Sequence, residues 1–264
     1  MARSALLNVM VQAALKAGRS LSRDFGEVQN LQVSLKGPSD YVSQADRKAE
    51  EIILGELSRA RPTYGVLAEE SGEEKGTDGQ HRWIVDPLDG TTNFLHGIPL
   101  FAVSIALERQ GEIVAGVVYN PAMDELFTAE RGNGAFVNDR RMRVAGRRTL
   151  TDCVIGTGVP HLGRGQHGKY LIELRHVMGE VAGIRRMGAA ALDLAYVAAG
   201  RLDGFWEESL SPWDLAAGIL MIREAGGFVS DRDGGGRMFE KQNIVAGNER
   251  IHKELMSVLK RPAN

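Results

Sequence analysis

The chain has 264 residues, with 32 basic and 34 acidic side chains and a formal net charge of -2. This length favours one large domain or two closely packed ones. The near-neutral charge argues against binding that depends mainly on neutralising many nucleic-acid phosphates, although a local basic patch is still compatible with it. With 43% hydrophobic and 25% charged residues, the composition is typical of a soluble globular protein.

Cysteine content and hydropathy indicate the compartment. The single cysteine, Cys153, excludes an intrachain disulfide and a thiolate cluster for zinc or iron-sulfur chemistry, so we expect a reducing cytoplasm. Apolar residues near the N-terminus recur at helical spacing and are interrupted by Asn8 and Gln12, which favours an amphipathic helix over a signal peptide. No apolar run reaches the roughly 18 to 20 residues that a membrane span needs, so we expect no membrane association.

The first half of the chain predicts helices followed by a strand-rich region. After the N-terminal helix, a polar connector runs to about Asp40, and a second helix is expected from Ser43 until Pro62. Ser43 and Asp46 resemble an N-terminal cap with an early carboxylate. The expected strands cover residues 64–68, 82–85, 101–108, 113–119, 125–129 and 135–137. Turns containing glycine and asparagine separate the later strands, which predicts an antiparallel sheet.

From Val154 onward, short strands alternate with helices. The expected helices cover residues 167–179, 190–200, 213–225 and 249–260, and the expected strands lie near 184–187, 205–207, 227–230 and 244–246. We therefore expect a single unit over residues 1–264 with two subdomains, approximately 1–150 with an antiparallel sheet and 151–264 with an α/β layer. No linker-like tract separates these halves, so they should share a wide interface.

The strongest local signal is the segment WIVDPLDGTTN at residues 83–93. An apolar strand delivers Asp86 to its open end, Pro87 ends the strand, and Asp89 follows three residues later. Two carboxylates and the Leu88 carbonyl can then converge on one point. Hard cations such as Mg²⁺ favour these oxygen ligands and retain waters, which leaves room for a substrate phosphate.

The same segment continues with groups that suit an anion. The backbone N–H groups of Gly90, Thr91 and Thr92 follow at an expected helix start. An isolated D-P-x-D sequence would more often be a solvated turn with incidental acids. The complete strand-DPxDGTT context favours a metal and phosphate site instead.

Other carboxylates extend this set. Glu69 and Glu70 end the preceding strand, and Asp214 follows Pro212 and Trp213 at an expected helix N-terminus. Alone, each acid is more often structural, because acids stabilise helix starts. Together with the Asp86 turn they supply enough carboxylate for a two-metal site, in which one ion activates water and the other stabilises the leaving oxygen.

A family resemblance is carried by three segments: GVLAEES, WIVDPLDGTTNF and SPWDLAAGILMIREAGG. They resemble the inositol monophosphatase family, part of a superfamily of Mg²⁺-dependent, lithium-sensitive sugar and inositol phosphatases. The segment IRRMGAAALDLAYVAAGRLDGFWE resembles its bacterial inositol-1-monophosphatase branch. The resemblance covers essentially the whole chain. It implies a layered αβαβα sandwich of the α+β class, usually a homodimer, that hydrolyses myo-inositol 1-phosphate to inositol and phosphate by in-line attack of metal-activated water.

The resemblance also implies metal ligands. Glu69, Asp86 and the Leu88 carbonyl match the ligands of a first Mg²⁺ ion. Asp86, Asp89 and Asp214 match those of a second ion, and a weaker third position is implied near Glu69 through water. Two ions, with a possible third, are therefore expected.

Catalytic and substrate roles follow from the same resemblance. Thr91 matches the residue that, with Glu69, orients and activates the attacking water, and Asp89 is the third expected catalytic residue. Glu207 matches a glutamate that hydrogen-bonds the hydroxyls of the sugar or inositol. The expected substrate-binding residues are Gly90, Thr91, Gly188, Ala189, Ala190, Glu207 and Asp214.

Some positions fit the family pattern less closely. Ala189 stands where a serine or threonine is common, and the missing hydroxyl is expected to relax selection among polyols. Lys36 and Asp46 resemble a mobile lysine loop and an acid near the water shell. Among the 32 glycines, Gly72 joins Gly90 and Gly188 at or beside the expected loops, where a missing side chain permits tight turns. Cys153 is expected to be a buried apolar side chain, and His96 is the histidine nearest the motif.

Two alternatives remain. The shared metal motif also fits phosphatases for 3′-phosphoadenosine 5′-phosphate, histidinol phosphate or fructose 1,6-bisphosphate, although Glu207 favours polyol phosphates. Some relatives in the bacterial branch also associate with the transcription and RNA-processing machinery, so association with RNA polymerase or Nus factors is a second hypothesis. Residues 140–148 contain five arginines, but no interleaved aromatics for base stacking, which favours a solvated hairpin face.

Overall fold

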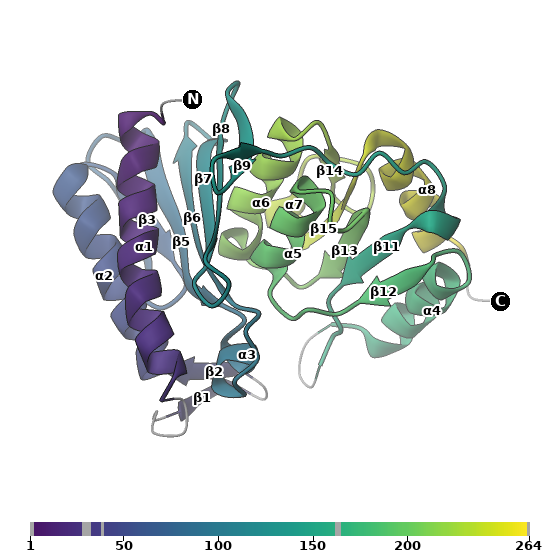
Figure 1. The fold of residues 1–264 in the computed structure, drawn as a ribbon, viewed down its shortest axis with the longest axis horizontal. Coiled ribbons are helices and arrows are strands. Elements are labelled where there is room, and N and C mark those ends of the chain that lie inside the picture. The colour runs from purple at the N-terminus through teal and green to yellow at the C-terminus, as the bar shows by residue number, and fades with distance from the viewer. Residues whose placement is uncertain (1–2, 28–32, 38–39, 162–164, 263–264) are drawn as a thin grey trace.

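The computed structural model describes residues 3–27, 33–37, 40–161 and 165–262, and its elements stack in five layers (Figure 1). Two helices cover the outer face of an eight-stranded sheet: α1 (Ala5–Phe25) and α2 (Gln44–Ala60). Two more helices lie between this sheet and a five-stranded sheet: α5 (Ala190–Ala198) and α6 (Pro212–Glu224). The last layer contains α4 (His167–Met178) and α8 (Glu249–Leu259). The expected α+β class and αβαβα sandwich are therefore confirmed.

The eight-stranded sheet comes entirely from the first 141 residues of the chain. In spatial order its strands are β10 (Arg140–Arg141), β9 (Gly134–Val137), β8 (Glu125–Glu130), β7 (Glu112–Asn120), β6 (Ala102–Arg109), β5 (His81–Asp89), β3 (Gly65–Ala68) and β4 (Gly72–Glu74). All neighbours are antiparallel except β3 and β5, which are parallel. The predicted antiparallel sheet and the hairpin between β6 and β7 are confirmed.

Strand β5 extends further than the sequence predicted. Asp86 pairs with Ser104 of β6, the register then shifts, and Asp89 pairs with Ala102. Pro87 has no N–H group, so it interrupts the ladder at this irregularity without ending the strand. Both aspartates consequently belong to one strand, on either side of a local distortion.

The five-stranded sheet belongs to the second half. Its order is β12 (Gly183–Arg185), β11 (Val154–Thr157), β13 (Gly204–Glu208), β15 (Asn243–Gly247) and β14 (Phe228–Ser230). Strand β11 is parallel to both of its neighbours, whereas β15 is antiparallel to both of its own. The predicted alternation of strands and helices is confirmed, and the sheet is mixed.

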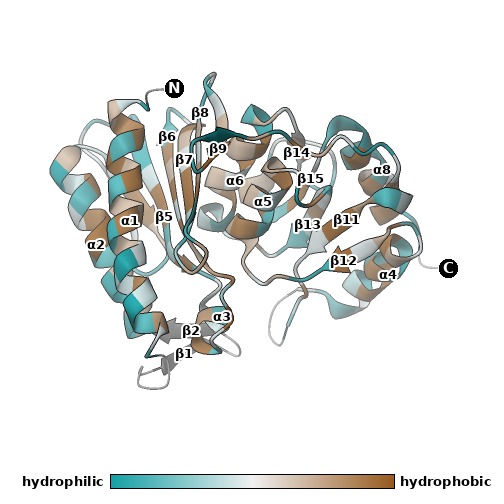
Figure 2. Ribbon diagram, viewed as in Figure 1, coloured by the Kyte–Doolittle hydropathy of each residue, from teal (hydrophilic) through white to brown (hydrophobic). Residues whose placement is uncertain are grey.

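The outer helices fold as their periodicity predicted. Ser4 caps α1 by accepting a hydrogen bond from the backbone N–H of Leu7 at 3.1 Å. The faces turned toward the sheet are buried and apolar, whereas the opposite faces are hydrophilic (Figure 2). On α2 the buried apolar residues are Ala45, Ala49, Ile53 and Leu57. No helix in the described ranges is long and apolar enough to cross a membrane.

The region before α2 differs from the expected connector. Two short antiparallel strands occur there: β1 (Val33–Gly37) and β2 (Asp40–Ser43). Ser43 ends β2, and α2 begins at the next residue. Strands this short carry too little alternation of apolar and polar residues to be recognised from the sequence, and they are identified by their pairing with each other. The side chain of Lys36 lies outside the part of the chain that is described in atomic detail.

The middle helices connect the two halves. One continuous core contains side chains from the first sheet, the second sheet and both helices between them; its members include Ile84, Phe127, Leu194, Phe205, Leu220 and Ile244. Helix α6 contacts β5, β6, β7, β8 and β9 although it comes from the second half of the chain. This packing agrees with the expected wide interface between the two halves. The division of a single unit into two subdomains near residue 150 stays a prediction.

Candidate active site

The sequence-predicted site residues surround one cleft between the two sheets. It is lined by the end of β5, the loop before α5, the end of β13 and the start of α6. The predicted residues on its wall are Glu69, Asp86, Leu88, Asp89, Gly90, Thr91, Gly188, Ala189, Ala190, Glu207 and Asp214. Positions up to 145 residues apart in the chain, from Glu69 to Asp214, thus border the same space.

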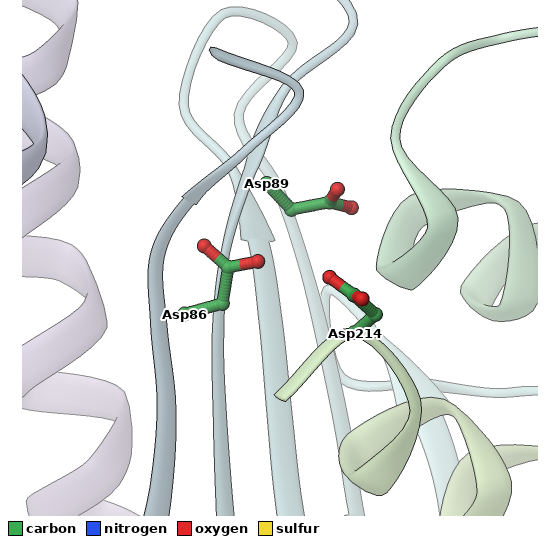
Figure 3. Close-up of side chains that lie close together, drawn as sticks. All are labelled: Asp86, Asp89 and Asp214. Atoms are coloured by element: carbon green, nitrogen blue, oxygen red, sulfur yellow. The ribbon is translucent and has the colours of Figure 1, made fainter. Parts of the chain in front are cut away.

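Three aspartates form the centre of the cleft. Asp86 and Asp89 extend from β5 and Asp214 from the first turn of α6, and all three carboxylates face a common space (Figure 3). One carboxylate oxygen from each residue lies within 4.8 Å of those of the other two. Oxygen ligands at this spacing suit a hard divalent cation. The arrangement therefore fits a metal centre.

Backbone donors orient each of these carboxylates. Asp86 Oδ1 accepts a hydrogen bond from the N–H of Leu88 at 2.9 Å, within the distorted part of β5. Asp89 Oδ2 accepts from the N–H of Ala191, in the first turn of α5, at 2.8 Å. Asp214 Oδ2 accepts from the N–H of Ser211 at 2.6 Å in a capping box at the start of α6. Asp86 and Asp214 are thus held by their own segments, whereas Asp89 is held by the start of α5.

Asp86 and Asp89 are costly to ionise without a cation. Burial, followed by the negative charges of Glu69, Asp89 and Asp214, raises the pKa of Asp86 well above its usual value. Burial also raises the pKa of Asp89 to about 7, although backbone N–H groups such as that of Ala191 oppose the shift. A bound cation reverses this balance by favouring the ionised carboxylates. The donor set and its electrostatics both fit a metal ion.

The turn after β5 packs closely against the loop before α5. Gly90 has a φ of +89°, and a Cβ there would lie 2.9 Å from the carbonyl oxygen of Leu100 and 3.2 Å from the Cβ of Ala189. Glycine is required by both the left-handed backbone and this close approach. The amide of Asn93 donates to the carbonyls of Leu100 and Met187, at 2.7 and 2.8 Å, and so connects the two loops.

Thr91 begins α3 (Thr91–Leu95), directly beside the aspartates. Its hydroxyl lies 3.0 Å from the Leu88 carbonyl oxygen and 3.3 Å from Asp46 Oδ1. Asp46 is a buried residue of α2 and is 1% exposed. The hydroxyl can therefore donate to a buried carboxylate while its oxygen accepts a hydrogen bond from a neighbouring water.

The adjacent glutamates have different positions. The N–H of Glu69 donates to the Val85 carbonyl at 3.1 Å, which places Glu69 beside β5 and on the cleft wall. The N–H of Glu70 donates to Glu50 Oε2 at 2.9 Å, on the side of α2. Glu70 lies outside the residues that line the cleft, although the sequence analysis counted it among the acids around the Asp86 turn.

Several cleft residues were missed by the sequence analysis. Gly158, His161 and Arg186 also line the cleft. Arg186 is a cation two residues before the expected substrate loop at Gly188, which is the one local signal that pointed to it. Asp193 of α5 is 1% exposed, and burial, with Glu207 and Asp89, raises its pKa well above the usual value. Asp193 stands alone among apolar residues of α5, so nothing in the sequence indicated that it is buried near Glu207 and Asp89.

Three other expectations have mixed outcomes. Cys153 is buried, as predicted, and burial is the main cause that raises its pKa to about 12. His96 is exposed at the end of α3, outside the cleft lining. Gly90 and Gly188 line the cleft, whereas Gly72 lies outside its lining, at an exposed position in β4 with a φ of +81°.

The five-layer fold and the carboxylate-lined cleft define an α+β protein with the site of a metal-assisted hydrolase. The family model described as "Inositol monophosphatase family" matches residues 2–261, and the chain belongs to this family of phosphatases. The resemblance seen in the sequence and the expected phosphoric monoester hydrolase class are therefore confirmed.

Individual relatives carry two kinds of name. Inositol-1-monophosphatase of Mesorhizobium japonicum is 76% identical and aligns over 99% of this chain and 98% of its own length. Nus factor SuhB of Pseudomonas aeruginosa is 46% identical over 96% of this chain and 95% of its own. The crystal structure of extragenic suppressor protein suhB from Bartonella henselae has a TM-score of 0.97 and 73% identity, and covers 98% of this chain and 100% of that one.

Proposed function

We propose that this protein is a Mg²⁺-dependent phosphatase that hydrolyses myo-inositol 1-phosphate to inositol and phosphate. The observation that carries the proposal is the convergence of Asp86, Asp89 and Asp214 beside the Gly90 turn, with Glu207 on the wall of the same cleft. The names of close relatives support the substrate. The aspartates suit the metal, the turn suits the phosphate, and the glutamate suits a polyol hydroxyl.

The metal ligands are assigned within this proposal. Glu69, Asp86 and the Leu88 carbonyl would hold a first ion, and Asp86, Asp89 and Asp214 a second, with a weaker third position near Glu69. When bound, Mg²⁺ lowers the pKa of a water molecule and neutralises charge on the phosphate oxygens. The buried carboxylates of the centre fit this role because their ionisation depends on a nearby positive charge.

The remaining catalytic groups belong to the protein itself. Thr91, with Glu69, orients the attacking water. The Thr91 hydroxyl takes a proton from this water as it passes its own proton to the buried carboxylate of Asp46, which is 3.3 Å away. The backbone N–H groups of Gly90 and Thr91 bind the phosphate oxygens and stabilise the charge that develops during in-line attack.

The substrate's alcohol portion occupies the other side of the cleft. Glu207 accepts hydrogen bonds from hydroxyls, beside Asp214 and the loop formed by Gly188, Ala189 and Ala190. Ala189 is 1% exposed and contributes only a methyl group where a hydroxyl is common in the family. We expect this difference to broaden the range of polyol phosphates that the cleft accepts.

A substrate panel tests this function. At fixed Mg²⁺, kcat/KM should be higher for myo-inositol 1-phosphate than for histidinol phosphate, fructose 1,6-bisphosphate or 3′-phosphoadenosine 5′-phosphate. A preference for one of the other three would assign the protein to that related activity. Lithium should inhibit the hydrolysis, as the family resemblance implies, and constant activity across increasing Li⁺ would contradict this part.

Metal binding should strengthen as pH rises. The pKa of Asp89 is about 7 in the folded protein, above its unfolded value, so the metal-free fold binds more protons and loses stability as pH rises from about 4 to 7. A bound cation favours ionised Asp89. We therefore expect Mg²⁺ to raise the melting temperature more at pH 8 than at pH 5.5, with apparent affinity rising about tenfold per pH unit for each proton released.

Thermal melts in Mg²⁺ and in NaCl of equal ionic strength measure this effect. Stripping the protein with a chelator beforehand provides the metal-free reference. An increment in melting temperature that is the same at both pH values would contradict the linkage between metal binding and Asp89.

A second role and the assembly state belong to the same proposal. Relatives named Nus factor SuhB support an additional association with the transcription machinery. The five arginines of residues 140–148 are exposed, and Arg147 is paired with Asp203 at 3.0 Å. We also propose a homodimer and a cytoplasmic location, which rest on the family resemblance and the single cysteine.

A further inference from the structure

The carboxylate of Glu207 lies directly over the backbone of Gly158. Gly158 is buried and follows the last residue of β11. A Cβ at this position would lie 1.8 Å from Glu207 Oε1 and 1.9 Å from its Cδ. These separations are far below any van der Waals contact, so Glu207 can occupy its position only because residue 158 has no side chain.

The sheet explains why the carboxylate lies there. Strands β11 and β13 are parallel, and Thr157 pairs with Trp206, which brings Gly158 next to Glu207 in the same register. On the other side of β13, Glu207 is opposite Ile244, which is fully buried. An apolar side chain therefore borders Glu207 on one strand, and bare backbone borders it on the other.

Glu207 borders two spaces. Gly158 and Glu207 line the main cleft, and both also line a smaller cavity that is bordered by Tyr170 and Trp206. A methyl group at position 158 would have to move the carboxylate toward one of these spaces. Either movement changes the oxygens that the cleft presents to a substrate.

We propose that Gly158 is a positioning residue for substrate selection: its missing side chain allows Glu207 to hold its carboxylate where hydroxyls of a polyol phosphate bind. The proposal rests on the proposed function, in which Glu207 accepts hydrogen bonds from the substrate. Gly158 acts through Glu207 and leaves the metal-binding aspartates of β5 and α6 unchanged. It therefore affects the choice among phosphate monoesters more than the hydrolytic step.

The variant Gly158→Ala tests this directly. Gly158 is not among the residues with positive φ, so alanine adds a methyl group without backbone strain. The measured quantity is the ratio of kcat/KM for myo-inositol 1-phosphate to kcat/KM for 4-nitrophenyl phosphate, which has no hydroxyl group on its ring. We expect this ratio to fall roughly tenfold to a hundredfold, as loss of hydrogen bonds to a charged group would produce. Gly168→Ala is the matched control, because a Cβ there meets nothing within 4 Å.

A double-mutant cycle separates positioning from general damage. Glu207→Ala should lower the same ratio, and adding Gly158→Ala to it should lower the ratio no further. Gly158→Ala should also not lower the melting temperature when it is added to Glu207→Ala, because the carboxylate that the new methyl group would meet is gone. This thermal comparison applies even if Gly158→Ala folds poorly.

Three results would overturn the proposal. The first is a substrate ratio that Gly158→Ala leaves unchanged, and the second is a double variant in which the two single effects on the ratio multiply. The third is a fall in melting temperature caused by Gly158→Ala that persists when Glu207→Ala is added. Failure of the proposed function has a different signature. In that case the unmodified chain hydrolyses neither phosphate ester in Mg²⁺, while the melting temperatures still report whether Gly158 accommodates Glu207.

Discussion

Replacing Asp86 with asparagine should abolish Mg²⁺-dependent hydrolysis of myo-inositol 1-phosphate, by roughly a thousandfold or more, and leave the fold intact. Asp86 is assigned to both metal ions, and a neutral amide is a poor ligand for Mg²⁺. The amide oxygen can still accept the hydrogen bond from the Leu88 N–H, which is 2.9 Å from Asp86 Oδ1. The loss should therefore come from the metal centre.

The metal-free stability of Asp86→Asn gives an independent check. Negative charges of Glu69, Asp89 and Asp214 surround the buried Asp86 carboxyl, so removing its ionisable group relieves repulsion. In chelator the variant should melt at the same temperature as the unmodified protein or higher, and Mg²⁺ should stabilise it less. Asp152→Asn removes an exposed carboxylate outside the cleft and is the control. Near-normal turnover by Asp86→Asn would refute the two-metal assignment.

The same variant distinguishes the two proposed roles. If association with RNA polymerase or Nus factors is a separate function, these proteins should co-purify equally well with Asp86→Asn and with the unmodified chain. Absence of any association with either protein would remove the second role. Association that is lost only in Asp86→Asn would connect it to the metal centre.

Removing the hydroxyl of Thr91 should give the second-largest effect. Thr91→Val retains the shape and the backbone N–H of this residue but cannot relay a proton toward Asp46, which is 3.3 Å from the hydroxyl. We expect kcat to fall roughly a hundredfold to ten-thousandfold, the range of general acid-base contributions, while KM changes little. Steady-state kinetics at saturating Mg²⁺ measure both quantities.

Two companion variants test the relay itself. Thr91→Ser restores a hydroxyl and should recover a large part of kcat. Thr151→Val changes an exposed threonine of the short 3-10 helix Leu150–Asp152 and is the control for the substitution. If Thr91→Val changed KM and left kcat intact, the hydroxyl would belong to substrate binding, and the proposed proton relay would be wrong.

Local sequence predicted the longer helices and strands and the Asp86 segment of the site, but not the short strands β1, β2 and β4. The apolar run before Asp86 and the glycine at position 90 predicted a strand and a tight turn beside two carboxylates, because these preferences act within a few residues. The proline at position 87 was expected to end the strand, whereas β5 continues through it to Asp89. The five-layer sandwich was predicted through the family resemblance. Periodicity alone indicated only a first half rich in antiparallel strands and a second half of alternating strands and helices.

Contacts between distant segments required the tertiary structure. Asp214 lies near Asp86 because α6 packs against the first sheet. Glu207 lies over Gly158 because β11 pairs with β13. The pKa shift of Asp193 likewise depends on burial against other segments.

Near-neutral net charge and a single cysteine limited the classes of function from the start, and the DPLDGTT segment determined the chemistry at one strand end. The tertiary structure decided which distant residues complete that chemistry: Asp46 beside Thr91, Asn93 between two loops, and Gly158 beneath Glu207. The physical reason is that a turn or a helix is stabilised by neighbours in the chain, whereas a cleft is shaped by the packing of sheets and helices. A small residue such as Gly158 acquires its role only from the side chain that lies over it.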